Sequence, residues 1–351
     1  MNRTASSNLE PARHAFALIE AVAASALSVI LLALLLAAGS NTRRQARLGD
    51  DIAKLRDLGA ATAAYAADYQ DSIWSFSWKG GVTYTTPYPE LNSASTDLQA
   101  QANQAIYILR THGNVPLAQP INNWIANIQY SHFALAVHQR RPLPDFGSIS
   151  SADKVRLQWA QNPTGTGQGP YGPYPCGGPI PTPHCHTRPR SASFQLVIAA
   201  YDGSREGSRV SQHGLPHSSF LVPQGAVLGG RPLSEVAFPA SKVLVSDIHG
   251  RHFGVRQPYC THDEARLPVL FADGAVTVRS ASESNQGWQP NFAVLPSPSQ
   301  ISYTPQEWDP PTISGAASDA VVGRFRYTRG CPTNLLAGRD FDGPEACLPP
   351  P

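Results

Sequence analysis

Near the N-terminus, the chain carries an apolar stretch from Phe16 to Ala38 in which Glu20 is the only charged residue. A stretch of this length and composition is typical of a helix that crosses a lipid bilayer. A single carboxylate inside such a helix is costly and usually marks a contact with a specific partner. We therefore predict a transmembrane helix over residues 16–38, preceded by a polar leader over residues 1–15.

The helical pattern continues beyond the apolar stretch and becomes amphipathic. Residues recur at steps of three and four along one face, at Leu48, Ile52, Leu55, Leu58, Thr62, Tyr65 and Tyr69. Charged residues such as Arg47, Asp50 and Lys54 occupy the other face. This pattern predicts one long helix from about Ala17 to Tyr69, whose second part (residues 39–70) packs its apolar stripe on a sheet.

The middle of the chain, residues 71–190, has a different pattern. Helical periodicity predicts a helix over Thr96–Arg110 that is capped by Thr96 and a second helix over Ile121–His138. It also predicts a shorter helix that begins near Ser150, with the serine as its N-cap. The segment Asn162–Arg190 is dominated by Pro, Gly and Thr and predicts a loop. We interpret residues 71–190 as a helical and Pro/Gly-rich insertion.

The last part of the chain, residues 191–351, shows short runs rich in β-branched and aromatic residues. These predict strands over Phe194–Tyr201, Ser218–Val222 and Lys242–Asp247, and a hairpin formed by Leu267–Ala272 and Ala275–Arg279. Asp273 and Gly274 would form its turn, of the primed type that needs positive φ at both positions. The expected fold class is α+β: a long N-terminal helix packed on an antiparallel sheet, with a loop-rich insertion.

Composition limits the classes of partner. The chain has 351 residues, a formal net charge of +2 and only 15% charged residues. Near-neutral charge argues against nucleic acid as a main partner, since nucleic-acid binding usually needs a basic patch. The 32 prolines and 28 glycines predict many turns and irregular loops.

All five cysteines follow the apolar stretch, as expected for a domain exported to an oxidising compartment. The pairs that are close in sequence are Cys176 with Cys185 and Cys331 with Cys347, which would leave Cys260 unpaired. Sequence alone does not fix connectivity, so other pairings stay open.

The N-terminal pattern resembles the start of the type IV pilin and pseudopilin family. The features that carry the resemblance are a short basic leader ending in Ala15, then Phe16-Ala17-Leu18-Ile19-Glu20 and a long apolar helix. The resemblance implies cleavage by a prepilin peptidase between Ala15 and Phe16, and methylation of Phe16. It also implies that Glu20 meets the N-terminal amine of a neighbouring subunit and sets the register of a helical filament.

A second resemblance lies in the C-terminal region. The segment from Phe238 to Asp247, His262 and the run Phe271-Ala272-Asp273-Gly274 are similar to the C-terminal half of many large pilin-like proteins. The tail, with Phe325–Gly330 and Gly338–Phe341, also resembles the ending of some of these proteins.

Together the resemblances imply a structural subunit of a pseudopilus or pilus, in a type II secretion or type IV pilus-like system of a bacterial envelope. Such a subunit crosses the inner membrane once and carries its C-terminal domain in the periplasm or on a surface filament. Its partners would be the prepilin peptidase, other pilin-like subunits and the inner-membrane assembly platform. This reading includes no enzyme activity and needs no cofactor.

Two metal hypotheses accompany this reading. Calcium is known in some pseudopilins, and Asp263, Glu264 and Asp273 could supply oxygen ligands, although solvated loop carboxylates are the simpler interpretation. His184 and His186 flank Cys185 and suggest a metal site. Zinc sites usually show paired ligands at defined spacings, so a disulfide loop is favoured there.

Two alternative classes of function remain. The run from Lys242 to Gly250 is similar to the first motif of metallophosphoesterases, in which Asp247 and His249 would bind a metal that activates water. The other motifs of that family are missing from the sequence. The chain could instead be a membrane-anchored extracytoplasmic binding protein, with the tryptophans near a ligand site, at Trp74, Trp78 and Trp124.

Overall fold

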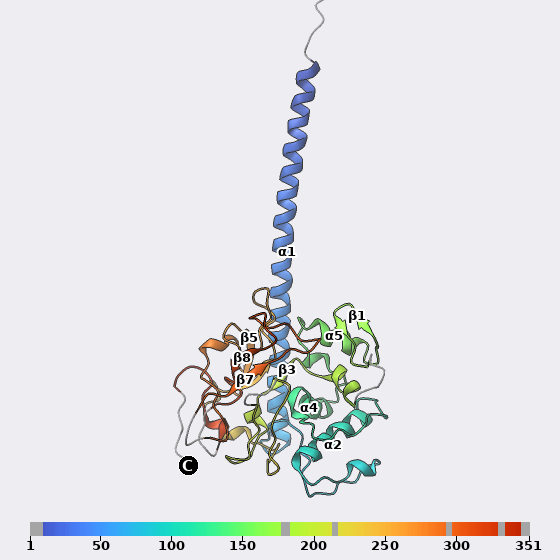
Figure 1. The fold of residues 1–351 in the computed structure, drawn as a ribbon, viewed down its shortest axis with the longest axis vertical. Helices are drawn as coiled ribbons and strands as arrows, with labels where there is room; N and C mark the ends of the chain where they lie inside the picture. The colour runs from blue at the N-terminus through green and yellow to red at the C-terminus, as the bar shows by residue number, and fades with distance from the viewer. Residues whose placement is uncertain (1–9, 177–182, 213–216, 293–296, 329–333, 345–351) are drawn as a thin grey trace, which may run out of the picture. The chain divides into compact units, whose positions relative to one another are not determined.

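The computed structural model describes residues 10–176, 183–212, 217–292, 297–328 and 334–344 (Figure 1). In the N-terminal helix, the side chains of residues 10–19, 34–38 and 40 are outside the described part. The chain divides into two units after Arg47, and residues 48–351 form one compact unit.

Helix α1 runs without interruption from Glu10 to Asp68. The single long helix predicted from the sequence is therefore present, although it begins before Ala17 and includes part of the segment predicted to be a leader. Among the described residues, no helix is both long enough and apolar enough to span a membrane. The predicted span over residues 16–38 is itself only partly described.

Two helices of the middle region, α2 and α5, lie close to predicted ones. Helix α2 spans Asp97–Thr111, and its N-cap is the predicted Thr96, whose side chain accepts a hydrogen bond from the Gln99 amide at 3.3 Å. Helix α5 spans Lys154–Gln161. Its N-cap is Asp153, which accepts from the Arg156 amide at 3.1 Å, so the prediction of Ser150 as the cap was wrong.

The helix predicted over Ile121–His138 was wrong in its first part. The structure instead has a short α3 over Asn127–Tyr130 and α4 over His132–His138. Asn123 and Gln129 both adopt positive φ, of 56° and 68°, and a left-handed residue interrupts the helical hydrogen-bond ladder.

Short 3-10 turns connect many of the elements. They are η1 Pro89–Leu91, η2 Phe146–Ser148, η3 Pro183–Cys185, η4 Arg188–Arg190, η5 Ile198–Ala200, η6 Leu233–Glu235, η7 Ala281–Glu283 and η8 Leu335–Ala337.

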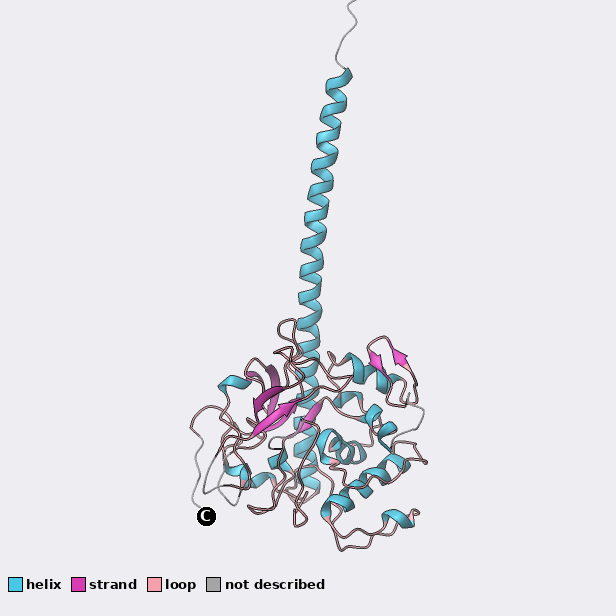
Figure 2. Ribbon diagram, in the orientation of Figure 1, coloured by secondary structure: helices cyan, strands magenta, loops and turns pink. Residues whose placement is uncertain are grey.

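The main sheet is antiparallel, with four strands in the order β3-β4-β5-β6 (Figure 2). Their bounds are β3 Phe194–Leu196, β4 Val243–Asp247, β5 Arg266–Phe271 and β6 Val276–Ser280. The predicted strand Ser218–Val222 was wrong, because that segment makes only an isolated bridge between Ser211 and Leu221.

Two further strand pairs were not predicted. β1 (Gln168–Gly169) pairs with β2 (Gly172–Pro173) inside the segment expected to be a loop. β7 (Gln300–Tyr303) pairs with β8 (Asp319–Val322).

The structure places Asp273 and Gly274 in the turn between β5 and β6. Gly274 has φ of +87°, whereas Asp273 is not among the residues of positive φ. The expectation of a primed two-residue turn was therefore wrong. The hairpin closes through a hydrogen bond from the Phe271 amide to the Ala275 carbonyl at 2.9 Å, which leaves a three-residue loop with glycine in the left-handed position.

The second part of α1 packs into the core that surrounds the sheet. Leu55 and Leu58 are buried in the same cluster as Val243 and Leu270. Gly59 approaches this sheet closely, because a Cβ at Gly59 would lie 3.0 Å from Leu270 Cδ1. The α+β class predicted from the sequence is thus confirmed, with helix and antiparallel sheet in one core.

A second hydrophobic cluster belongs to the predicted insertion. It gathers residues of α2 and α4 with the segment before them, including Phe76, Ile106 and Phe133. The insertion therefore brings its own small core, although it is part of the compact unit of residues 48–351.

Candidate functional site

The first part of α1 exposes apolar side chains around the helix. Among the described residues between Glu20 and Ala33, the large apolar side chains are 52% to 67% exposed: Val22, Leu27, Val29, Ile30, Leu31 and Leu32. Such a helix needs an apolar environment supplied by lipid or by other helices. Glu20 is exposed and is the only ionisable residue of this described stretch.

The predicted cleavage and methylation positions are less completely described. Ala15 and Phe16 lie within the helical span of α1, but their side chains are outside the described residues. The structure therefore gives the backbone of this segment and leaves its side-chain contacts open.

The second part of α1 is held to the compact unit by buried hydrogen bonds at Asp51. Its carboxylate lies 2.7 Å from Nε2 of His252, and the side chains of both residues are almost fully buried. The same carboxylate accepts hydrogen bonds from the Ser150 hydroxyl and, at 2.7 Å, from the Ser151 amide. Asp51 thus fixes α1 to the start of the α5 region and to the loop after β4.

Lys54, on the next turn of α1, reinforces this attachment from the surface. Its Nζ donates to the Ile149 carbonyl at 3.0 Å and to the Ser151 hydroxyl at 2.8 Å, and it pairs with Asp50 at 2.9 Å. Hydrogen bonds to Ser151 and Lys54 lower the pKa of the largely exposed Asp50.

Sequence reasoning missed Asp51, although the signal was present. Asp51 precedes Leu55 by four residues and Leu58 by seven, so it lies on the face of the helix that the apolar stripe defines. A carboxylate on a buried face requires a partner. The identity of that partner, His252, was beyond reach because the two residues are 201 positions apart.

A buried charge network continues from this contact. Arg251 pairs with Asp153 at 2.8 Å and, through Nε, with Asp247 at 3.1 Å. Arg156 pairs with Asp153 at 2.9 Å. Burial acts to raise the pKa of Asp153, but the guanidinium groups of Arg251 and Arg156 outweigh it and hold that pKa well below its usual range.

Asp247 and His249, the residues of the phosphoesterase-like motif, both lie in this network. Oδ1 of Asp247 accepts from the His249 amide and from Arg251, whereas Oδ2 of this buried side chain has no hydrogen-bond partner. Burial raises the pKa of Asp247 to about 6; Arg251 opposes the shift, and the carboxylate of Asp51 adds to it.

His249 does not face an open coordination site. Its Nε2 lies 3.2 Å from the Tyr303 hydroxyl, and its Nδ1 lies 3.2 Å from Nη2 of Arg251. Burial, followed by the charge of Arg251, lowers the pKa of His249 well below its usual value. Both ring nitrogens of His249 and one carboxylate oxygen of Asp247 are thus committed to protein partners, which is a poor arrangement for a metal that must bind water.

The two segments of the C-terminal resemblance meet in a second buried ion pair. Nζ of Lys242 lies 3.2 Å from Oδ2 of Asp340, both side chains are fully buried, and Nζ also donates to the Thr328 hydroxyl. Asp340 further accepts from the Val243 amide at 2.8 Å. The tail that contains Asp340 is therefore fastened to the start of β4.

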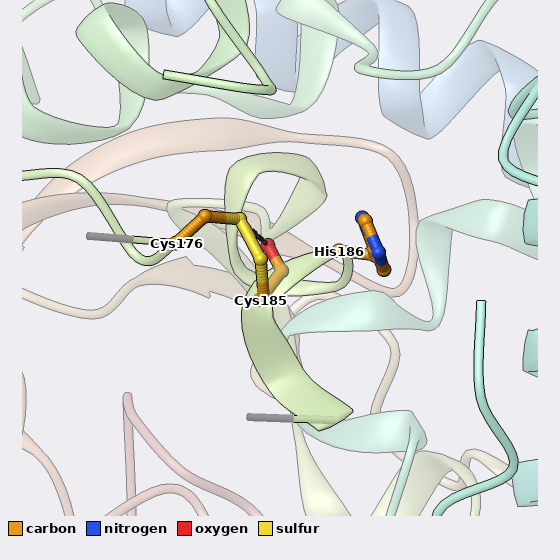
Figure 3. A group of neighbouring side chains, drawn as sticks. All are labelled: Cys176, Cys185 and His186. Atoms are coloured by element: carbon orange, nitrogen blue, oxygen red, sulfur yellow. Dashed lines mark hydrogen bonds between the residues drawn. A yellow bond between two sulfur atoms is a disulfide. The ribbon is translucent and has the colours of Figure 1, made fainter. Parts of the chain in front are cut away.

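Cys176 and Cys185 form a disulfide, as the spacing suggested (Figure 3). Cys260 is a buried free thiol, and burial raises the pKa of Cys260 to about 11. The predicted pair Cys331 and Cys347 lies outside the described residues.

Within the described ranges, one group of three metal-ligand side chains comes together: Cys176, Cys185 and His186. Two of its three ligand atoms are the sulfurs of the disulfide, and a disulfide sulfur lacks the thiolate charge that binds a metal. In Figure 3 the His186 ring lies to one side of the sulfur–sulfur bond. The group therefore does not make a metal site while the disulfide is intact.

The calcium candidates do not form a described cluster either. Asp263 pairs with Arg324, and Asp273 accepts a hydrogen bond from the Ala275 amide at 2.9 Å within its own turn. Glu264 is exposed. The described geometry matches the interpretation of solvated loop carboxylates.

The tryptophans of the binding-protein hypothesis fall in two clusters. Trp74 is 1% exposed and donates to the Thr62 hydroxyl at 2.7 Å, inside the core around the sheet. Trp78 stacks on Tyr84, with ring centroids 4.3 Å apart, and it packs against the cluster of the insertion, which contains the buried Trp124. Trp74 is thus a core residue, whereas Trp78 and Trp124 belong to the second cluster.

Comparisons with protein-family models, with curated proteins and with solved structures found no match to the chain.

Proposed function

We propose that this chain is a pilin-like structural subunit, processed by a prepilin peptidase and assembled into a pseudopilus or pilus of a bacterial envelope. In this proposal it is anchored once in the inner membrane, and residues 48–351 are on the periplasmic side or on a surface filament. Its partners are the peptidase, related subunits and the assembly platform in the membrane. The proposal assigns no catalytic step, cofactor or nucleic acid to the chain.

One observation carries the proposal: the contrast along α1. Glu20 stands at the fifth position counted from Phe16, in a helical segment whose described apolar side chains are exposed. The same helix continues into a compact α+β unit, where Leu55 and Leu58 are buried. A helix that is exposed and apolar in one part, and core in the other, is suited to joining a folded domain to a bundle of identical helices.

The chemistry of assembly follows from charge in a low-dielectric environment. Cleavage between Ala15 and Phe16 would create a new α-amino group near the end of α1. In lipid, the carboxylate of Glu20 would be strongly attracted to the amine of a neighbouring subunit, since Coulomb energies rise as the dielectric constant falls. A contact between different surfaces of identical subunits builds an open filament when the rotation between subunits does not close into a ring.

The proposal is tested by replacing Glu20 with Ala and measuring filament assembly by electron microscopy and pelleting of sheared fibres. The matched control is Ser25→Ala, which removes a polar group from the same exposed helix segment, where the Ser25 hydroxyl donates only to backbone carbonyls. We expect Glu20→Ala to insert in the membrane but fail to assemble, and Ser25→Ala to assemble normally. Normal filaments from Glu20→Ala would contradict the proposed role of the carboxylate.

A further inference from the structure

Three adjoining cavities form a groove on the compact unit. The largest, of about 690 Å³, is bordered by Tyr171 and Trp308. It shares Trp308 and Arg156 with a cavity of about 150 Å³, which in turn shares Arg188 with a third cavity of about 470 Å³. Because neighbouring cavities share lining residues, we treat them as one elongated site and call it the Trp308 groove.

Trp308 lies where the largest and the smallest cavity meet. The guanidinium of Arg188 lies over its indole ring, 4.4 Å from the centroid, and the ring of Trp159 meets it edge-on at 5.8 Å. Both of these partners border the smallest cavity and neither borders the largest. The indole is therefore held firmly from one side, while another part of it borders the largest cavity.

A second aromatic ring, that of Tyr171, also borders the largest cavity. Tyr171 is 52% exposed, and Nζ of Lys154 lies 5.2 Å from its ring centroid. Trp124 and Tyr130, both largely buried, border the third cavity. The lining of the groove thus combines aromatic side chains with polar groups, which is the composition of a ligand site.

Arg188 is one of the positively charged groups of this groove that no described carboxylate meets at hydrogen-bond distance. Its half-buried guanidinium lies over the ring of Trp308, and the more distant charge of Asp309 also acts on it. Asp309 also borders the smallest cavity, but its carboxylate is paired with Nε2 of His217 at 3.2 Å. Guanidinium groups pair with carboxylates in a two-point geometry and also stack on aromatic rings.

We propose that the Trp308 groove binds an acidic oligosaccharide. A carboxylate of the ligand pairs with Arg188, and the C–H faces of sugar rings lie against Trp308 and Tyr171. Gln257 and Glu307, which border the largest cavity, are placed to exchange hydrogen bonds with sugar hydroxyls. This site is independent of Glu20 and of filament assembly.

The lining of the groove favours a sugar over an acidic peptide. Extended peptides commonly add to the free edge of a sheet, where backbone groups supply the hydrogen bonds. None of the described residues that border the two cavities meeting at Trp308 belongs to a strand, and of those that border the third cavity only Gln195 does, in β3. Recognition there depends on side chains and aromatic faces.

The test is calorimetric titration of the full chain in detergent with hexagalacturonate, an oligosaccharide with one carboxylate per ring. Its methyl ester is the neutral probe, and hexaglutamate is the acidic peptide probe. We expect saturable binding of hexagalacturonate, weakened about tenfold or more by esterification or by Arg188→Gln, since a hydrogen bond to a charged group is lost in either case. The control is Arg205→Gln, at an exposed arginine outside the groove, which should bind like the wild type.

A second variant separates stacking from charge. Tyr171→Ala removes a half-exposed ring and should weaken hexagalacturonate and its methyl ester by a similar factor, of several-fold, while the fold stays intact by circular dichroism. The proposal is overturned if hexagalacturonate does not bind, or if its affinity is the same for Arg188→Gln and Arg205→Gln. Equal or tighter binding of hexaglutamate would assign the groove to acidic peptides instead.

Discussion

The two parts of helix α1 belong to one continuous helix, yet large apolar side chains are exposed in the first part and buried in the second. Between Glu20 and Ala33, large apolar side chains are more than half exposed and the only charge is a carboxylate in the open. Beyond Arg47, Leu55 and Leu58 are buried, and the charge on the same face, Asp51, is buried with them. Helical propensity alone does not distinguish the two parts.

The difference shows where each part finds its partner. The second part finds it within the chain, in the sheet and in His252, so its sequence mixes an apolar stripe with a charged outer face. The first part has no described partner in the chain, and its apolar surface surrounds the helix. The fold therefore explains the sequence of the second part of α1. For the exposed apolar surface of the first part, we propose partners outside the chain, namely lipid and neighbouring subunits.

The largest difference between the two parts of α1 is expected at Asp51. Asp51→Ala leaves His252, the Ser150 hydroxyl and the Ser151 amide without their acceptor and should lower the free energy of unfolding by about 3 to 5 kcal/mol, since each buried donor left unpaired costs about 1 to 3 kcal/mol. Asp50→Ala is the matched control one residue earlier, where an exposed ion pair is lost at a cost of about 0 to 1 kcal/mol. Denaturant unfolding followed by near-UV circular dichroism measures both. Equal effects of the two substitutions would refute the attachment of α1 through Asp51.

Replacing a leucine of α1 by alanine should change the unfolding free energy much more in the second part of the helix than in the first. Leu58→Ala creates a cavity in the core around the sheet and should cost about 2 to 5 kcal/mol of unfolding free energy. Leu27→Ala, in the exposed part, should change it by less than about 0.5 kcal/mol. The unfolding midpoints in detergent report on both. A large effect of Leu27→Ala on the unfolding of the compact unit would break the comparison.

The charge network beside Asp51 predicts a pH dependence through Asp247. Its pKa is raised to about 6, above its ordinary value of 3.8, so the folded state binds the proton more tightly than the unfolded state does. The contribution of Asp247 to stability is therefore greatest below pH 4 and falls as pH rises from about 4 to 6.

This dependence is measured as the difference in unfolding free energy between the wild type and Asp247→Asn at pH 4 and at pH 7. The wild type should lose stability relative to the variant by up to about 3 kcal/mol over this interval. The same comparison for Asp57→Asn, on the exposed face of α1, sets the baseline. A relative gain of the wild type with rising pH would show that the sign is wrong.

The smallest effect is expected at the disulfide, which lies away from α1 in sequence and closes a short loop. Cys176 and Cys185 are 9 positions apart, and a loop of this length stabilises a fold by about 2 to 3 kcal/mol at most. Adding a reductant should lower the unfolding midpoint of the wild type. It should have no effect on a variant that carries Cys176→Ser and Cys185→Ser. An unchanged effect of reductant in that variant would place the sensitive bond elsewhere.

Local patterns predicted the elements that depend on neighbours in sequence. The Thr96 cap of α2 and the β5–β6 hairpin around Gly274 were foreseen because caps and turns are decided within a few residues. The prediction of one helix over Ile121–His138 was wrong because Gln129 adopts a left-handed conformation, and nothing in the local sequence indicates it. Strands β7 and β8 were missed because each is only four residues long.

Buried polar pairs between residues that are far apart in the sequence could not be predicted. Lys242 and Asp340 both fall in segments singled out by resemblance, yet nothing in either segment indicates that they meet across 98 positions. Asp51 could have been placed on the buried face by its spacing to Leu55. The Asp247-x-His249 motif shows that a sequence match to a metal motif can also mislead. In the fold, Asp247 is hydrogen-bonded to Arg251, and His249 lies at hydrogen-bond distance from Tyr303.

We propose that the exposed, apolar part of α1 serves assembly once a leader has been cleaved. This is tested by mass spectrometry of the N-terminal peptide of the mature protein, purified from the membrane fraction of cells that contain a prepilin peptidase. We expect a peptide that begins at N-methylated Phe16. An intact leader that begins at Met1, or a mature end beyond Ala38, would contradict it.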